Sequence, residues 1–195
     1  FLNRLEPDSA AYSIPVVLHL DGPLDVAALR AAFVDVAERH EPLRTVTPLV
    51  DDEPVQRILA GADAQPPFLA IDVPEDRVEA VVRQEAMRPF DVTVETPLRA
   101  VLLRVAPERH VLVATMHHIA SDGWSLAPFA RDLGTAYAAR AAGEEPGWAP
   151  LAVDYADFAL WQREHLGSAD DPDSELSTQL AHWRGVLDGA PDEIS

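Results

Sequence analysis

Residues 98–116 contain two apolar stretches, LRAVLLRV at 98–105 and HVLVATM at 110–116, with Pro107, Glu108 and Arg109 between them. Runs of this length that are rich in β-branched and other apolar residues and bounded by turn-forming residues are typical of β-strands. Because so few residues connect the two runs, the second strand must fold back along the first. The stretch therefore predicts an antiparallel β-hairpin.

Further strand signals lie N-terminal to this hairpin. Residues 14–20 (IPVVLHL) end at the turn sequence Asp-Gly-Pro, and residues 68–73 form another short apolar run. Segments 44–50 and 54–59 flank the acidic residues 51–53 and predict a second hairpin.

Five segments carry apolar residues at helical spacing. The first begins at Asp25, whose side chain can cap a helix, and ends near His40, where Glu41-Pro42 stops it. The others cover residues 75–87, 125–142, 153–165 and 175–188. Hairpin strands combined with separate helices predict an α/β (α+β) sandwich.

The composition excludes several classes of function. The chain has 195 residues, 33 acidic against 15 basic, and a formal net charge of −18, which disfavours nucleic acid and anionic membranes as partners. No apolar run approaches the roughly 20 residues of a membrane helix. With no cysteine, the chain has no disulfide, thiolate metal site or thiol nucleophile. Because it begins at Phe1, we expect it to lie inside a longer polypeptide or to have lost its start.

The richest cluster of polar side chains follows the second strand of the hairpin. Residues 115–125 read TMHHIASDGWS, so two adjacent histidines leave the strand and a Ser-Asp-Gly turn leads into a helix. Side chains of neighbouring strand residues point to opposite faces. Only one of His117 and His118 can therefore face a given site, while Asp122 lies at the turn.

Three interpretations of this cluster remain open on the residues alone. The histidines can simply make local hydrogen bonds at a strand end. Two histidines and a carboxylate can bind a metal ion, although adjacent histidines do not easily chelate the same ion. One histidine can act in acid–base or positioning chemistry, because its ordinary pKa is near 6.5.

Four ordered motifs add a family resemblance. Residues 116–125 (MHHIASDGWS) resemble the HHxxxDG signature of condensation domains in nonribosomal peptide synthetases. Residues 39–45 (RHEPLRT) resemble the RHExLRT motif, residues 155–163 (YADFALWQR) resemble YxDFAxWQR, and residues 179–191 resemble the stretch that follows it. In the first of these motifs, Trp124 and Ser125 come directly after Gly123, as in condensation rather than epimerisation domains.

The resemblance implies a fold and a domain boundary. Residues 1–195 match one chloramphenicol-acetyltransferase-like lobe, the N-terminal lobe of a condensation domain. The expected form of this lobe is a mixed β-sheet flanked by helices. The first residues of its opening motif and the whole C-terminal lobe are absent. The SDGWS ending is most similar to the subtype that joins an L-configured donor to an L-configured acceptor.

The resemblance also implies a reaction and the residues that perform it. His118 matches the active-site histidine of amide-bond formation between two carrier-bound thioesters. His117 matches a structural histidine, and Gly123 a point of close approach for the substrate arm. Asp122 matches a brace that pairs with an Arg, in this family often one from the C-terminal lobe. Arg44, Trp124 and Ser125 are candidate cleft residues, although Arg44, like Arg39, is equally interpreted as an ion-pairing residue at a helix end. We expect Trp124, together with Tyr155, Phe158 and Trp161 at helical spacing, to be packed in the core.

The implied partners follow from the same family. No cofactor is bound directly, since the substrates arrive on the 4′-phosphopantetheine arms of upstream and downstream peptidyl carrier proteins. The C-terminal condensation lobe and an adenylation domain would adjoin the chain, with no nucleic acid, metal or membrane involved and a cytoplasmic location. Two alternatives are a lobe of a coenzyme-A-dependent HxxxD acyltransferase and a non-catalytic carrier-docking lobe. We expect the lobe to be inactive alone, because its cleft has only one wall.

Overall fold

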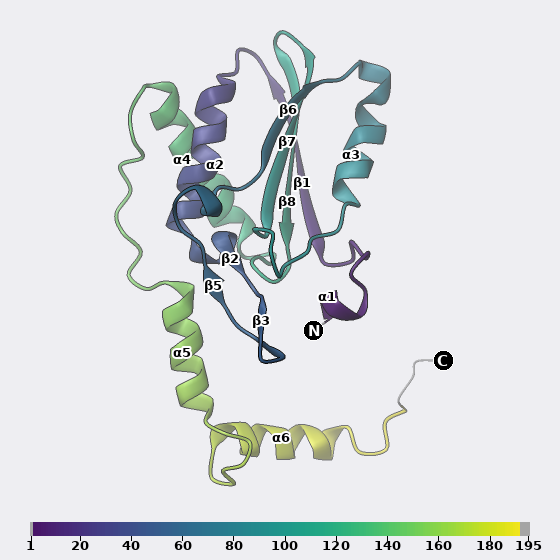
Figure 1. Cartoon of the computed structure of the whole chain (residues 1–195), viewed down its shortest axis with the longest axis vertical. Helices are drawn as coiled ribbons and strands as arrows, with labels where there is room; N and C mark the ends of the chain where they lie inside the picture. The colour runs from purple at the N-terminus through teal and green to yellow at the C-terminus, as the bar shows by residue number, and fades with distance from the viewer. Residues whose placement is uncertain (1, 192–195) are drawn as a thin grey trace. The chain divides into compact units, whose positions relative to one another are not determined.

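A computed structural model describes residues 2–191 of the chain (Figure 1). The chain divides into two compact units, Phe1–Leu151 and Ala152–Ser195. The first unit contains the β-sheet and its flanking helices, and the second contains two helices.

A four-stranded sheet forms the centre of the first unit. The predicted hairpin is present as β7 (Leu98–Ala106) and β8 (Arg109–His117), which pair antiparallel. On either side lie β1 (Ser13–Asp21), antiparallel to β8, and β6 (Phe68–Asp72), parallel to β7. The strand order β1-β8-β7-β6 therefore mixes both directions, as the family resemblance implies.

Helices cover both faces of this sheet (Figure 1). Helices α2 (Val26–Arg39) and α4 (Leu126–Ala141) lie against one face, where Phe33 and Phe129 pack with Leu112 of β8. Helix α3 (Val78–Ala86), preceded by the 3₁₀ turn η3 (Glu75–Arg77), lies against the other face with Val101 and Val113. Because strand side chains alternate between faces, odd-numbered residues of β7 and β8 face α3 and even-numbered ones face α2 and α4.

The second predicted hairpin is present but interrupted. It consists of β2 (Thr45–Val46) paired with β5 (Arg57–Ile58) and of β3 (Leu49–Val50) paired with β4 (Glu53–Pro54). Pro48 lies between the two pairs and has no amide hydrogen to donate, so the ladder breaks there. Asp51 and Asp52 have φ values of 52° and 62° and form the tight turn between β3 and β4.

Short helical segments complete the first unit. These are α1 (Leu2–Leu5) and the 3₁₀ turns η1 (Glu41–Arg44) and η2 (Gly61–Ala64). The side chain of Asp25 accepts a hydrogen bond from the Ala28 amide, 2.9 Å long, so the predicted cap of α2 is confirmed.

The second unit contains α5 (Tyr155–Leu166) and α6 (Glu175–Val186). Asp154 and Asp157 form a reciprocal capping box at the start of α5. The prediction that Tyr155, Phe158 and Trp161 pack in a core is wrong, because α5 has no buried residue. Their rings instead contact one another along the helix, with centroids 5.7 and 5.8 Å apart. A two-helix unit has too little apolar surface to enclose side chains of this size.

Across residues 2–191, no helix combines the length and the apolar content needed to cross a membrane.

Candidate functional site

The two histidines of the motif lie on opposite sides of the end of β8. His117 is the last residue of the strand and is buried on the face that α3 covers, whereas His118 begins the following turn and is exposed. The alternation predicted from the sequence is therefore confirmed. Only His118 of the pair is accessible to another molecule.

His117 organises the loop from inside. Its Nδ1 accepts a hydrogen bond from the Ile119 amide at 3.0 Å, and its carbonyl accepts from the amide of Ala120 and the hydroxyl of Ser121. Its ring lies beside Phe90 and Tyr12, with centroids 5.9 and 6.3 Å away. Burial, with the charges of His118 and Arg99, lowers the pKa of His117 below its ordinary value. The ring is therefore neutral at pH 7, which leaves Nδ1 free to accept.

His118 is held by its backbone rather than by its side chain. Its amide donates to the Tyr12 carbonyl at 2.8 Å, which continues the β1–β8 pairing for one step past the strand. Among residues 2–191 its imidazole makes no hydrogen bond or ion pair. Both ring nitrogens are thus available to a ligand.

Asp122 contacts its own turn rather than an arginine. Its Oδ1 accepts from the Ser125 hydroxyl at 2.7 Å and from the Ser125 amide at 2.9 Å, and these bonds lower the pKa of the carboxyl group below its usual range. Within residues 2–191 it has no ion-pair partner, and pairing with an Arg of a C-terminal lobe stays a prediction. Asp122 and Ser125 together close the turn that leads into α4.

The two residues between Asp122 and Ser125 face open space. Trp124 is 90% exposed, so the prediction that it is packed is wrong. A Cβ added at Gly123 would meet no atom within 4 Å, and the φ of Gly123 is not in the left-handed region. Neither backbone strain nor packing within the described residues explains a glycine there.

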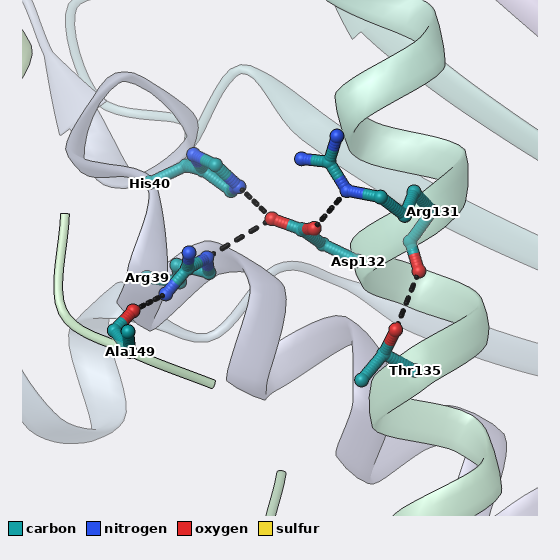
Figure 2. Close-up of polar contacts among 6 residues, drawn as sticks. All are labelled: Arg39, His40, Arg131, Asp132, Thr135 and Ala149. Atoms are coloured by element: carbon teal, nitrogen blue, oxygen red, sulfur yellow. Dashed lines mark hydrogen bonds and ion pairs between the residues drawn. The ribbon is translucent and has the colours of Figure 1, made fainter. Parts of the chain in front are cut away.

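A buried carboxylate ties the RHEPLRT segment to α4 (Figure 2). Asp132 of α4 lies 3.0 Å from Arg39 Nε, 2.9 Å from His40 Nε2 and 3.0 Å from Arg131 Nε. Burial raises the pKa of Asp132, but the hydrogen bonds from His40, Arg131 and Arg39 outweigh it, so the pKa of this carboxyl group is lowered. The ion-pair interpretation of Arg39 is confirmed.

Arg39 also holds the connector after α4. Its guanidinium donates to the Ala149 carbonyl at 2.7 Å (Figure 2). The guanidinium carbon also lies 4.8 Å from the centre of the Trp148 ring. Arg44, the other arginine of the segment, donates to the Leu59 carbonyl at 2.7 Å and lies 3.5 Å from Glu41. Leu59 directly follows β5, so the first contact joins Arg44 to the end of the interrupted hairpin. A role of Arg44 in a cleft stays a prediction.

The site includes two buried charges that the sequence analysis missed. Asp132 follows Phe129 by three residues on the apolar side of α4, and a charge at such a position signals a buried ion pair. Arg99 is only 3% exposed within β7, where neighbouring residues are apolar. No group of three or more His, Cys, Asp or Glu side chains within residues 2–191 is arranged to hold a metal ion.

Comparison with known proteins agrees with the fold and the motif. The model of the condensation domain family matches residues 1–195. The chain is 47% identical to the isonitrile lipopeptide synthase of Mycobacterium tuberculosis and 45% identical to a dimodular nonribosomal peptide synthase of Bacillus subtilis, over its whole length in both cases. It spans 8% of each of those proteins.

Solved structures give the same result. An X-domain from teicoplanin biosynthesis, in complex with OxyB, is 36% identical with a TM-score of 0.89 over 98% of this chain and 42% of that one. The starter condensation domain of rhizomide synthetase has the same fold, with a TM-score of 0.80, 98% of this chain covered and 46% of that one, at 22% identity. The central His motif and the sheet that carries it thus occur in a chain that belongs to the condensation domain family of nonribosomal peptide synthetases.

Proposed function

We propose that residues 1–195 are the N-terminal lobe of a condensation domain that forms amide bonds, and that His118 is its active-site histidine. Condensation domains in general are peptide-bond-forming acyltransferases. The observation that carries the proposal is the position of His118, exposed at the end of a central strand with both ring nitrogens available. The chain spans less than half of each of the two solved structures described above, and we propose that the complete reaction also uses residues outside it.

The proposed reaction joins two carrier-bound substrates. The α-amine nitrogen of the acceptor attacks the thioester carbon of the donor, so a C–N bond forms and the C–S bond breaks. The amine proton ends on the departing thiol of the donor phosphopantetheine. The balance needs no oxidant, metal or further cofactor.

His118 can act in this step as a general base or by positioning the amine, and the size of the two rate effects favours positioning. An α-amine has a pKa of about 7.7–8.0, so roughly a tenth of it is already neutral at pH 7. General-base assistance is worth about 10²- to 10⁴-fold, whereas correct orientation of two reactants reaches effective molarities of about 10⁵–10⁸ M. We therefore assign His118 mainly to holding the amine by a hydrogen bond, with proton transfer secondary.

Substitutions of His118 in the complete domain test this role. Gln and Asn can still hold an amine by a hydrogen bond but are not bases. The His118→Gln or His118→Asn domain should therefore be about tenfold or more as active as the His118→Ala domain. The assay is product formation between aminoacyl-loaded carrier proteins. His19→Ala, which removes an exposed histidine on β1, is the matched control and should be active. Equal loss in all three His118 variants would assign proton transfer to His118 instead.

The substrate subtype and the partners are part of the proposal. Upstream and downstream peptidyl carrier proteins would deliver an L-configured donor and an L-configured acceptor, beside the C-terminal lobe and an adenylation domain, in the cytoplasm. We propose that the lobe alone is inactive. The Trp124-Ser125 sequence directly after Gly123 supports the L-to-L assignment. Assaying the complete domain with L- and D-configured donors tests it, and a preference for the D-donor would overturn it.

A second candidate is a docking module. The similarity to an X-domain, whose structure was determined in complex with OxyB, supports this alternative. The two functions differ in one measurement. A domain that binds aminoacyl carriers but forms no peptide bond, with wild-type and His118→Ala proteins indistinguishable, would favour docking over catalysis.

A further inference from the structure

Arg99 is a buried arginine placed between α3 and the histidine motif. Arg99 is 3% exposed and lies on β7, opposite Thr115 of β8. Thr115 comes two residues before His117. Odd-numbered residues of both strands face α3, so Arg99, Thr115 and His117 share one face of the sheet. Burying a guanidinium is costly unless its charge and hydrogen-bonding groups are satisfied.

The guanidinium binds the end of α3. Nη1 donates to the Pro89 carbonyl at 3.1 Å, and Nη2 donates to the Glu85 carbonyl at 3.4 Å and to the Arg88 carbonyl. The last carbonyls of a helix have no partner within the helix, and a cation near them is favourable. Arg99 therefore fastens the segment that leaves α3 to the central sheet.

The same side chain reaches the histidine motif through one aromatic ring. The guanidinium carbon of Arg99 lies 3.7 Å from the centre of the Phe90 ring. Phe90, 2% exposed, meets His117 at an interplanar angle of 82° with ring centres 5.9 Å apart. A cation over an aromatic face and an edge-to-face ring pair both favour defined geometries. Phe90 thus contacts Arg99 and His117 together.

We infer that Arg99 is a positioning residue of the condensation site: with Phe90 it holds His117 as a neutral hydrogen-bond acceptor and so fixes the turn that carries His118. The link to the loop is the 3.0 Å bond from the Ile119 amide to His117 Nδ1. Ile119 directly follows His118, so this bond and the one from the His118 amide to Tyr12 define the backbone on both sides of the exposed imidazole. The inference rests on the proposed role of His118.

The electrostatics of the site support this role. Burial and the neighbouring charges of His118 and Arg99 lower the pKa of His117. Tyr12, in the segment before β1, also lies beside the His117 ring, with ring centroids 6.3 Å apart. Burial and Arg88 lower the pKa of Arg99 to about 10, so the guanidinium remains charged at pH 7. If His117 is protonated, Nδ1 carries a hydrogen and can no longer accept from Ile119.

Two substitutions separate the charge of Arg99 from its shape. Arg99→Met removes the charge at similar length, whereas Arg99→Lys keeps a cation near Phe90 but cannot donate to all the same carbonyls. Arg104→Met is the matched control, because Arg104 lies on the same strand and pairs with Asp72 at the exposed end of the sheet. All three are made in the complete domain, with ¹⁵N-labelled histidine and with His117→Asn used to assign the His117 signals.

The first readout is the His117 ring itself. We expect Arg99→Met to raise the pKa of His117 and to shift its Nδ1 resonance away from that of a neutral acceptor near pH 6. Arg99→Lys should leave both near wild type, and so should Arg104→Met. An unchanged His117 titration in a folded Arg99→Met protein would overturn the inference. If Arg99→Met does not fold, a raised pKa of His117 in Arg99→Lys, whose charge is retained, would overturn it as well.

The second readout is turnover. A displaced His118 should lower kcat about 10- to 100-fold while KM for the loaded carriers changes by less than about twofold. If Arg99 only stabilises the fold, the loss of activity should equal the fraction of protein that is unfolded, and it should shrink when the sample is cooled. His118→Ala distinguishes the two proposals. If that variant is fully active, the proposed function fails, whereas the effect of Arg99 on the His117 ring can still be observed.

Discussion

His117 and His118 are identical side chains in different surroundings, one residue apart. The strand repeat of two residues places His117 under α3, where it accepts a hydrogen bond from Ile119, and leaves His118 exposed. The division into one buried and one accessible histidine is predictable from the strand pattern alone. The identity of the groups around His117 is not, because Phe90, Tyr12 and Arg99 come from distant parts of the sequence.

Acidification should destabilise the protein through His117. Its pKa is lower in the folded protein than the ordinary value of about 6.5, so below that pH the unfolded chain binds more protons. The free energy of unfolding is then unaffected by this group above pH 6.5 and decreases as the pH falls below it. His117→Asn, which keeps an acceptor oxygen, should show a smaller decrease between pH 7.5 and 5.5 in urea denaturation.

His19→Asn is the control for that experiment. It removes an exposed histidine of β1 that is not among the groups lowering the pKa of His117, so its loss of stability on acidification should match that of the wild type. Equal pH dependence in the His117 and His19 variants would show that His117 is not the titrating group.

Gly123→Ala should separate stability from activity. An added Cβ meets no atom within 4 Å and the backbone is not left-handed, so the unfolding free energy should change by less than about 0.5 kcal/mol. In the complete domain we expect peptide formation to fall tenfold or more, because Gly123 is proposed to allow close approach of the substrate arm. Ser121→Ala, which removes a hydroxyl from the same loop, is the comparison for stability. An active Gly123→Ala domain would remove the glycine from the proposed site.

Helix α4 follows the histidine motif directly, and ion pairs made by two buried carboxylates attach it to α2. Asp132 binds Arg39 and His40 at the end of α2, and Arg140 donates two bonds to Asp35, 2.7 and 2.6 Å long, in the middle of α2. Apolar periodicity predicts both helices within a residue or two. It does not reveal that charged groups join them.

Asp132→Asn should destabilise the protein by about 3 kcal/mol, because it leaves Arg39 beside a neutral group in a mostly buried position. Urea denaturation at pH 7 measures this change. Arg131→Ala is the matched control: Arg131 binds the same carboxylate but is 68% exposed at its side chain, so its loss should cost less than about 1 kcal/mol. Similar losses for both variants would contradict the assignment of the stabilising contact to Arg39 and His40.

The whole chain carries a net charge of −18, which produces repulsion among its carboxylates. Salt screens this repulsion, with a Debye length of about 10 Å at 0.1 M. We therefore expect Tm to rise between 0.05 and 0.5 M NaCl, measured by circular dichroism. Asp76→Lys makes the net charge less negative at an exposed position, so the rise of Tm with salt should be smaller in this variant. A Tm that falls with salt would mean that surface pairs such as Arg104–Asp72 outweigh the repulsion.

Local patterns were sufficient to establish the strands, the main helices and the likeness of the motifs to condensation domains, because alternation, helical spacing and turn residues act over a few neighbouring positions. They failed for Trp124 and for the aromatic residues of α5, because an apolar side chain does not by itself specify what covers it. The partners of Arg99 and Asp132 likewise became evident only in the folded chain. Arg99 donates to backbone carbonyls at the end of α3, and Asp132 pairs with Arg39 and His40 of the segment that ends α2. These groups meet only when the sheet and its helices have packed together.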